Sequence, residues 1–553
     1  MSKDYLFHHE LSHSVCLGEH FDLSIQEGSK RYLISNTRDA DAEIYAPEIN
    51  WYFESSTDDW SVKADKLNNL YDARRIAFEG AEDVESSIRV GKKILVIADT
   101  AQQQLVAQLN LQDFTLVVQN SADILGFAGS LGNFVAQFKT DQGVVNIDAD
   151  QVIWFQAPAN IVELVGVHDP LQRGLGNTYQ DLLGCDGIFT YRNTVRYIRS
   201  SCLQSNKNGK VCNRCVEICP ANALAYSAEE KQILLSSIQC IGCGLCAGVC
   251  PTGALEYAPS PRSTFERATV FYRGSIPLIV SKDTDLTELE GPLPANILPL
   301  AVEDYGFLDE EYLLTLLQNS NHPILIYARE ESKIQMGSVR LLNEIFGKIY
   351  GRQVIYLCTS SGQVRENAEA AVCLPEDLIQ HVDEGVSRRV RLVERLSYIV
   401  GNADHGCITP DADMPYGAIT INEEHCTLCL SCVDACTLHA LEAHAEDNTL
   451  RFTPALCVQC GWCEQICPEV DCLKVAHGQL VLQASYFEQK IMAKDEIFNC
   501  VECGKGFAPA KSIAKIVTIM TEAFAGDPLR SRALSCCPDC KAKVMFESLS
   551  QDI

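Results

Sequence analysis

The chain has 553 residues, of which 47% are hydrophobic, so several folded domains are expected and a disordered chain is excluded. The 45 basic and 73 acidic residues leave a net charge of −28, which argues against binding to nucleic acid or anionic membrane surfaces and suits docking onto basic patches of other proteins. The segment Met1–Val15 has no apolar export signal and the apolar runs are strand-sized, so the sequence predicts a soluble, cytoplasmic chain, unless it travels with an exported partner. In such a chain, 27 cysteines point to metal or cofactor ligation rather than to disulfides.

Alternating strand and helix patterns come first along the chain. Lys93–Ala98 and Phe114–Val118 are rich in β-branched residues and flank the helix-like segment Ala101–Leu109, which predicts a parallel α/β unit. Phe134–Phe138 and Val144–Asp148 alternate about a Lys-Thr-Asp-Gln-Gly turn, which predicts a β-hairpin.

A cysteine-rich segment with the spacing of bacterial ferredoxins follows. Cys240, Cys243 and Cys246 are separated by two residues each, and Cys250 comes three residues later with Pro251 directly after it. Three cysteines at this spacing wrap a tight loop around one [4Fe–4S] cluster, and the fourth ligates the neighbouring cluster of a pair. The spacing therefore predicts a two-cluster module.

This cysteine pattern is repeated. Seven cysteines each recur 217 residues later in the sequence. They are Cys212, Cys215, Cys219, Cys240, Cys243, Cys246 and Cys250, and their counterparts are Cys429, Cys432, Cys436, Cys457, Cys460, Cys463 and Cys467. A single offset without insertions indicates a duplicated module, at about 200–256 and 418–476.

A second set of strand and helix patterns lies between the two modules. The predicted strands are Ile276–Val280, Pro323–Tyr327 and Val354–Cys358, and the predicted helices are Glu310–Leu317 and Ser338–Ile349. Pro-rich segments at Pro259–Pro261 and Pro292–Pro299 are typical of linkers, and Ser387–Val400 is typical of a basic amphipathic helix that leads into the second module.

The crossing of the fourth cysteine to the neighbouring cluster assigns the ligands. In the first module, one set is Cys240, Cys243, Cys246 and Cys219, and the other is Cys212, Cys215, Cys250 and a fourth ligand. In the second module, the sets are Cys426, Cys429, Cys432 and Cys467, and Cys457, Cys460, Cys463 and Cys436. Repeated four-cysteine runs in crossed pairs argue against zinc or structural thiols.

Three positions depart from the pattern. The expected place of the first module's missing ligand holds Gly209, so we expect Cys202 to loop back across Leu203–Val211; if it does not, that cluster would be three-iron or labile. Thr437 stands where proline usually follows the fourth cysteine, and we interpret this as harmless because proline is not a ligand. Cys472 lies where such modules bury a small apolar residue, and we interpret it as core.

Two further Cys-x-x-Cys pairs lie near the C-terminus. Cys500 and Cys503 form the first pair, and Cys537 and Cys540 form the second. Four thiolates make a closed tetrahedral site, which suits structural zinc, with a mononuclear iron as the alternative. Cys536 could compete with Cys537 as the ligand, and Ala508–Phe524 between the pairs is helix-like.

The remaining candidate sites are weaker. His9-Glu10-Leu11-Ser12-His13 matches a zinc-protease pattern, but it lacks an apolar helix and a third ligand, so we interpret it as a solvated terminal segment. No Walker loop and no G-x-G-x-x-G motif follows a strand, and we expect no catalytic residues. The isolated cysteines are expected to be buried thiols; they are Cys16, Cys185, Cys358, Cys373 and Cys407.

The first module resembles a family of large bacterial polyferredoxins. The resemblance is carried by Ser201-Cys202, by the run Asn208-Gly209-Lys210-Val211-Cys212-Asn213-Arg214-Cys215 and by Cys219-Pro220-Ala221, where a displaced cysteine precedes a Cys-x-Arg-Cys segment. The similarity to this family extends over most of the chain, including the C-terminal cysteine pairs. Members of this family accompany formate dehydrogenases, so the resemblance implies such an enzyme as partner. The middle domain resembles small electron-transfer subunits of hydrogenases and heterodisulfide reductases, without their cysteine cluster.

The expected fold is a multidomain α/β chain with two ferredoxin-like 2[4Fe–4S] α+β modules and a small C-terminal domain like a four-cysteine metal ribbon. The expected domains are an N-terminal α/β domain at 1–165, the first module with its lead-in at 166–260, a middle α/β domain at 261–400, the second module at 401–480 and the C-terminal domain at 481–553.

The expected function is electron transfer through four [4Fe–4S] clusters, with one zinc and no substrate site of its own, between a dehydrogenase and other redox proteins. One alternative is the iron–sulfur subunit of a flavin- or nicotinamide-dependent oxidoreductase. A second alternative is a maturation factor for a partner dehydrogenase.

Overall fold

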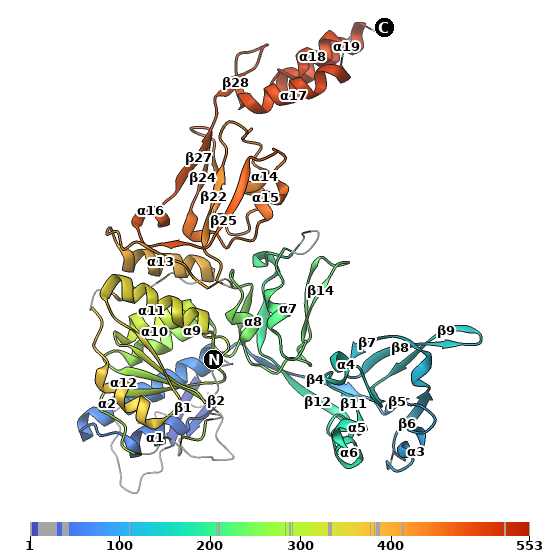
Figure 1. Cartoon of the computed structure of the whole chain (residues 1–553), viewed down its shortest axis with the longest axis vertical. Coiled ribbons are helices and arrows are strands. Elements are labelled where there is room, and N and C mark those ends of the chain that lie inside the picture. Colours follow the sequence, from blue (N-terminus) through green and yellow to red (C-terminus); the bar gives the residue numbers. More distant parts are fainter. Residues whose placement is uncertain are drawn as a thin grey trace.

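A computed structural model describes residues 3–8, 30–35, 44–109, 111–205, 207, 211–282, 284–286, 289, 291–329, 334–375, 378–380, 382, 387–411, 414–524 and 527–551. The chain forms a central α/β domain, a second α/β domain on a side arm, two cysteine-rich modules and a C-terminal helical unit (Figure 1). The segment His9–His13, Cys16 and Gly209 lie outside the described residues.

The central domain is built on a parallel sheet with strand order β18-β17-β19-β20. The strands are β17 (Ile276–Ser281), β18 (Ile297–Val302), β19 (Ile324–Tyr327) and β20 (Ile355–Cys358), and the helices include α10 (Glu310–Ser320), α11 (Met336–Tyr350), α12 (Ser361–Ala370) and α13 (Arg388–Val400). The predicted strands and helices of this region are confirmed. The linker predicted at Pro292–Pro299 is wrong beyond Asn296, because Ile297–Val302 forms an edge strand, where a proline is tolerated.

The first part of the chain also packs onto this central sheet. Helices α1 (Pro47–Ser55) and α2 (Trp60–Gly80) place Ile49 and Leu67 in the same hydrophobic core as Leu278 and Leu325. Helix α9 (Arg262–Thr269) packs against both α2 and α10. We therefore propose that residues 44–80 belong to the central domain rather than to a single N-terminal domain ending at residue 165.

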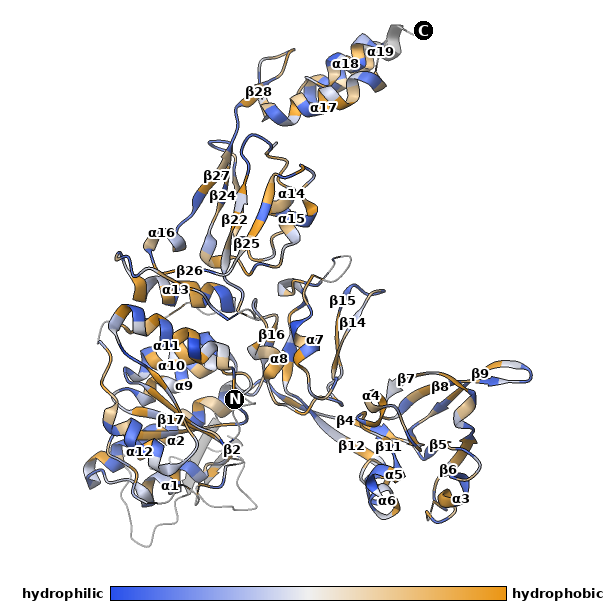
Figure 2. Cartoon of the chain, viewed as in Figure 1, coloured by the Kyte–Doolittle hydropathy of each residue, from blue (hydrophilic) through white to orange (hydrophobic). Residues whose placement is uncertain are grey.

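The side arm carries the other α/β domain. Its parallel sheet has the order β11-β10-β5-β6, made of β5 (Lys93–Ile97), β6 (Thr115–Gln119), β10 (Gln151–Trp154) and β11 (Val167–His168), with helices α3 (Gln103–Val106), α4 (Ala159–Val162), α5 (Pro170–Arg173) and α6 (Leu175–Gly184). An antiparallel sheet of β7 (Ile124–Ser130), β8 (Asn133–Thr140) and β9 (Gly143–Ala149) contains the predicted hairpin. The buried strands of both parallel sheets are predominantly hydrophobic (Figure 2).

A two-stranded ribbon connects the side arm to the rest of the chain. Strands β4 (Val84–Val90) and β12 (Gly187–Asn193) pair antiparallel over their whole length, from Val84 with Asn193 to Val90 with Gly187. The chain enters the side-arm domain along β4 and leaves it along β12 (Figure 1).

The two cysteine-rich modules share one architecture of short helices and antiparallel strand pairs. The first contains β13 (Val195–Tyr197), α7 (Arg214–Ile218), β14 (Leu224–Ser227), β15 (Gln232–Leu235), α8 (Leu245–Gly248) and β16 (Leu255–Tyr257). The second contains β22 (Gly417–Ile421), α14 (Ser431–Asp434), β23 (Leu441–His444), β24 (Thr449–Phe452), α15 (Trp462–Ile466), β25 (Leu473–His477) and β27 (Lys490–Lys494).

The C-terminal unit is more helical than a metal ribbon. A hairpin of β28 (Ile497–Asn499) and β29 (Gly506–Pro509) is followed by α17 (Ala510–Ala523), α18 (Pro528–Ala533) and α19 (Pro538–Gln551). The first cysteine pair lies in the turn of the hairpin, and the second pair lies at the start of α19. Among the residues described, every helix is too short or too polar to cross a bilayer.

Candidate metal centres

The cysteines of the modules gather into four groups, which we number from 1 to 4. Site 1 contains Cys219, Cys240, Cys243 and Cys246; site 2 contains Cys202, Cys212, Cys215 and Cys250; site 3 contains Cys436, Cys457, Cys460 and Cys463; site 4 contains Cys426, Cys429, Cys432 and Cys467. In each group, the electrostatic neighbours of one or more buried thiols show which cysteines lie close together.

Site 2 contains the displaced cysteine. Burial, together with the charges of Cys250, Cys212 and Cys202, raises the pKa of the Cys215 thiol to about 12. The Cys212 thiol also has a raised pKa, caused first by burial and then by Cys250 and Cys202. Cys202 is therefore close enough to act on the Cys212 and Cys215 thiols, although it lies before the loop that separates it from Cys212.

The loop after Cys202 is closed by a buried amide. The side-chain oxygen of Gln204 accepts hydrogen bonds from the backbone N–H groups of Val211 and Cys212, at 2.8 and 3.0 Å. Gln204 is 1% exposed, so these bonds are shielded from water. Sequence reasoning missed Gln204; its only signal was its position two residues after the displaced cysteine.

Site 1 lies directly beside site 2. Burial, followed by the charges of Cys240 and Cys243, raises the pKa of the Cys246 thiol, and Cys215 of site 2 and Cys219 act on it in the same direction. The loop that carries Cys240, Cys243 and Cys246 turns through Gly242 and Gly244, whose φ angles of 76° and 73° are left-handed and favour glycine.

Site 3 has the same crossed arrangement. The pKa of the Cys463 thiol is raised by burial and then by the charges of Cys457, Cys460 and Cys436, with a contribution from Cys432 of site 4. Burial raises the pKa of the Cys457 thiol to about 11, whereas the nearby charge of Arg389 acts to lower it. A small cavity of about 30 Å³ is lined by all four cysteines of this site.

Site 4 completes the series. Burial and the charges of Cys426, Cys429 and Cys467 raise the pKa of the Cys432 thiol to about 12. All four cysteines line a cavity of about 20 Å³, together with Cys472. Cys472 is 4% exposed and packs in the core of the second module, as its sequence position predicts.

These four groups fit [4Fe–4S] clusters. Each brings four thiols together from two or three chain segments, and a buried thiol with a raised pKa stays neutral unless a cation compensates its thiolate. Iron supplies that compensation when a cluster is bound, and four cysteines are the donor set that a cubane takes. Cys202 would supply the fourth thiol of site 2.

The C-terminal cysteines form a tighter site. The ligand atoms of Cys500, Cys503, Cys537 and Cys540 all lie within 4.8 Å of one another, and the Cys503 and Cys537 sulfurs are 3.7 Å apart. Four thiolates around one ion, with bonds of about 2.3 Å, place their sulfurs about 3.8 Å apart. This spacing suits a single tetrahedral ion rather than a cubane, which holds its thiolates farther apart.

Backbone donors prepare this tight site for a cation. The N–H of Cys537 donates to the Cys500 sulfur at 3.2 Å. Burial acts to raise the pKa of the Cys500 thiol, but backbone N–H groups of Cys537, Cys503 and Glu502 outweigh it and lower the pKa to about 6. Cys536 does not belong to the four, and its thiol donates to the carbonyl of Arg532 at 3.3 Å.

The isolated cysteines differ from one another. Cys185 and Cys358 are buried, as expected, but the expectation is wrong for Cys373 and Cys407, which are exposed. Cys373 lies in the segment after α12, and Cys407 lies in a two-residue strand at the edge of the second module, so neither is covered by a packed core.

The two modules touch each other where sites 2 and 3 face. The Nζ of Lys207 donates to the Thr437 hydroxyl at 3.2 Å and lies 5.8 Å from the centre of the Trp462 ring. Leu203 lines the same small cavity as the site 3 cysteines. The displaced-ligand loop of the first module thus reaches the second module directly.

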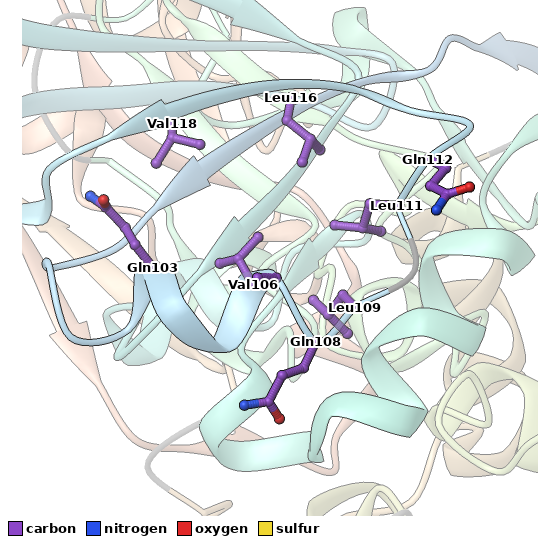
Figure 3. Close-up of a pocket in the computed structure, with 9 residues that line it drawn as sticks. Gln103, Val106, Gln108, Leu109, Leu111, Gln112, Leu116 and Val118 are labelled. Carbon is purple, nitrogen blue, oxygen red and sulfur yellow. The ribbon is translucent and has the colours of Figure 1, made fainter.

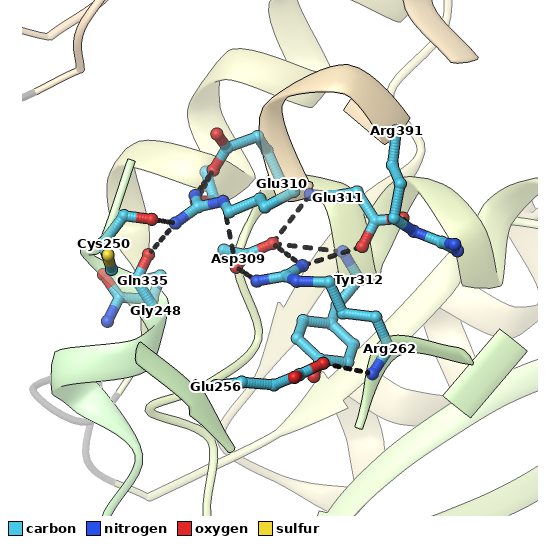
Figure 4. Close-up of polar contacts among 12 residues, drawn as sticks. Gly248, Cys250, Glu256, Arg262, Asp309, Glu310, Glu311, Tyr312, Gln335 and Arg391 are labelled. Atoms are coloured by element: carbon cyan, nitrogen blue, oxygen red, sulfur yellow. Dashed lines mark hydrogen bonds and ion pairs between the residues drawn. The ribbon is translucent and has the colours of Figure 1, made fainter. Parts of the chain in front are cut away.

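Buried arginines hold the modules against the central domain. Arg388 of α13 donates from Nη1 to the carbonyls of Gly248 and Cys250, at 2.9 and 2.5 Å, and its Nη2 lies 2.7 Å from Glu310. Figure 4 shows the neighbouring pairs of Arg262 with Asp309 and Glu311. Burial acts to raise the pKa of the Glu311 carboxyl, but Arg262, Arg391 and Arg395 outweigh it and hold the pKa at about 2. Helix α13 is basic and amphipathic as predicted, but its arginines are buried, which the sequence did not indicate.

A separate cavity of about 690 Å³ lies in the side-arm domain between α3 and β6 (Figure 3). It is lined by apolar side chains such as Val106, Leu111 and Leu116 and by glutamines such as Gln108. The described residues that line it include no cysteine and no titratable side chain.

Comparisons with known proteins match both cysteine-rich modules. Residues 210–254 match a family model described as a 4Fe-4S dicluster domain, and residues 418–468 match a second model with the same description. A stretch of 60 residues, 11% of the chain, is 40% identical to the indolepyruvate oxidoreductase subunit IorA of Pyrococcus horikoshii and spans 9% of that subunit. The chain therefore contains two 4Fe–4S dicluster domains and a C-terminal four-cysteine group, and these similarities support an iron–sulfur electron-transfer role.

Proposed function

We propose that the chain is an electron relay that carries four [4Fe–4S] clusters, one in each of sites 1 to 4, and one zinc ion in the C-terminal four-cysteine site. The chain's own residues would hold and insulate the clusters. When bound, each cluster supplies a one-electron redox centre.

The contacts support a linear order of the four sites. Cys215 of site 2 acts on Cys246 of site 1, and Cys432 of site 4 acts on Cys463 of site 3. The link between the two pairs is the contact of Lys207 with Thr437. This contact carries the proposal, because two modules held on a flexible tether would not need a shared interface at their facing sites.

The C-terminal unit would cover the last cluster. Ser512 of α17 donates to the carbonyl of Thr427 at 2.8 Å, and Lys515 pairs with Glu469. Both partners lie beside cysteines of site 4 and line its cavity. A zinc ion in the C-terminal four-cysteine site would stabilise the fold of this unit rather than carry electrons, because zinc has no redox chemistry.

Reductive titration tests the relay. Anaerobically purified, fully loaded protein should contain about 16 iron atoms and accept one electron per cluster, about four per chain. Protein that is loaded with iron and accepts only two electrons would contradict the proposal. By its resemblance to polyferredoxins that accompany formate dehydrogenases, the proposed partner is such a dehydrogenase in the cytoplasm, and reduction of the chain by that enzyme in the presence of formate would test it.

A cavity favours a second candidate, the iron–sulfur subunit of a flavin- or nicotinamide-dependent oxidoreductase. It measures about 430 Å³ and is lined by Arg74, Tyr257 and Phe307 among others. The Tyr257 and Phe307 rings stack at 4.6 Å, and the Tyr257 hydroxyl donates to the carbonyl of Gly242 in the site 1 loop. Acid extraction of the purified protein, followed by absorption spectroscopy, should release a flavin if this candidate is right.

A further inference from the structure

The central domain contains a network of buried ion pairs, and one further buried arginine forms no ion pair with the described residues. Four buried arginines pair with four buried carboxylates; the arginines are Arg262, Arg388, Arg391 and Arg395, and the carboxylates are Glu266, Asp309, Glu310 and Glu311. Arg389 is a fifth arginine on the same helix as Arg388. It is 2% exposed and has no carboxylate partner among the described residues.

Arg389 is directed at the loop that carries site 3. Its Nε donates to the carbonyl of Ala455 at 2.8 Å, and its Nη2 donates to the carbonyl of Cys457 at 2.9 Å. The guanidinium lies 4.4 Å from the centre of the Tyr416 ring. Its contacts are therefore neutral carbonyls and a ring face, which position the charge without cancelling it.

An isolated buried charge is costly unless an opposite charge lies nearby. A cubane with four thiolate ligands carries a net negative charge, and reduction adds one more. In a medium of low dielectric, a fixed positive charge beside the cluster favours the reduced form over the oxidised form.

We propose that Arg389 is the electrostatic partner of the site 3 cluster and raises its reduction potential above that of site 2, so that the first electron to enter the relay rests at the junction of the two modules. The inference rests on the proposed function only in requiring a cluster in site 3. The step is the transfer of one electron from a reduced redox protein to this cluster, with no bond made or broken.

Arg388 provides the internal comparison. It bonds the carbonyl of Cys250 in site 2 much as Arg389 bonds that of Cys457 in site 3, but Asp309 and Glu310 lie at 3.2 and 2.7 Å and balance its charge. Two adjacent arginines on α13 therefore bond one ligand loop each. Among the described residues, the one facing site 3 has no carboxylate at ion-pair distance, and the Glu310 carboxylate acts on it only from farther away. The lower potential is thus expected at site 2.

The test is a redox titration of the loaded protein followed by electron paramagnetic resonance. Arg389→Met should lower the potential of one cluster by at least a tenfold change in its reduction equilibrium, which is about 59 mV for one electron, and leave the other three in place. Arg389→Lys keeps the charge and should retain most of the potential. Arg451→Met removes a partly exposed positive charge from the same module, paired with Asp447, and should have little effect. Unchanged potentials in a fully loaded Arg389→Met protein would overturn the inference.

A second variant covers the case in which Arg389→Met fails to load or fold. Cys436→Ser should convert the site 3 cluster to a three-iron form, and the cubane component that then disappears from the titration should have a higher potential than the one that disappears in Cys202→Ser. Disappearance of a lower component instead would overturn the inference. Failure of the relay proposal looks different, because it would appear as an iron content far below four clusters in the unaltered protein.

Discussion

Lys207 in the first module donates a hydrogen bond to the side chain of Thr437 in the second, at 3.2 Å. This pair links two irregularities of the cysteine repeat. Thr437 occupies the position held by proline after Cys219, Cys250 and Cys467, and proline has no hydroxyl to accept this bond. Lys207 belongs to the loop that the displaced Cys202 creates. Both departures from the repeat thus meet at the contact between the modules.

The displaced cysteine gives the first prediction. Changing Cys202 to serine should convert the site 2 cluster to a three-iron form or abolish it, because the proposed fourth ligand is this thiol, which acts on Cys212 and Cys215. Low-temperature paramagnetic resonance of the oxidised variant should gain a three-iron signal. Cys185→Ser is the control, because that buried thiol belongs to none of the four groups. Four intact cubanes in the Cys202→Ser protein would show that another group completes site 2.

The second prediction concerns the C-terminal site. Changing Cys500 and Cys503 together to serine should abolish the bound zinc and unfold the C-terminal unit, since structural zinc binding is folding free energy. Metal analysis should find zinc lost and about 16 iron atoms kept. Cys536→Ser should keep the zinc, because its thiol faces the carbonyl of Arg532. Loss of about four iron atoms from the double variant would instead assign a cluster to this site.

The third prediction concerns the module contact. Lys207→Met removes a charged hydrogen bond from a residue that is 9% exposed, and such a bond contributes about 1.5 kcal/mol. Amide hydrogen exchange over residues 436–441 should therefore become roughly tenfold faster, with iron content unchanged. Lys207→Arg keeps a donor and should restore much of the protection. Unaltered exchange in the methionine variant would mean that the contact adds nothing to the stability of the junction.

The fourth prediction is a pH dependence in the side-arm domain. Burial lowers the pKa of His168 to about 4, and its Nε2 lies 3.2 Å from the side-chain oxygen of Gln151. The unfolded chain, with a histidine pKa of about 6.5, binds the extra proton first, so the domain should lose about 1.4 kcal/mol per unit as the pH falls from about 6.5 to about 4. Below that range the loss should level off.

Hydrogen exchange of the β10 amides, corrected for the intrinsic pH effect, measures this dependence. His168→Gln should flatten the slope, whereas His425→Asn changes an exposed histidine and should leave it unaltered. A wild-type slope of zero between pH 4 and 6.5 would contradict the prediction.

The cysteine motifs could be interpreted from sequence because their geometry is local. A run such as Cys240 to Cys250 places its sulfurs by the conformation of a few residues, so spacing alone indicates the grouping, and one unexplained position pointed to Cys202. The packing of Ile49 on the central sheet joins segments more than 200 residues apart, and no periodicity within either segment records it. The buried arginines escaped notice for the same reason, because the carboxylates that pair with Arg391 lie on other helices.

The paired ribbon of β4 and β12 makes the side-arm domain an insertion with its two ends side by side. Val90 and Gly187 are cross-strand partners, so the chain leaves the ribbon and returns to it at neighbouring points, which in an antiparallel pair lie about 5 Å apart. Residues 91–186 could be replaced by a short turn without a change in the course of the chain on either side. The replacement would remove the bonds of Glu163 and Val165 with Gln239, directly before Cys240, so any other domain grafted at this place would have to supply partners for that side chain.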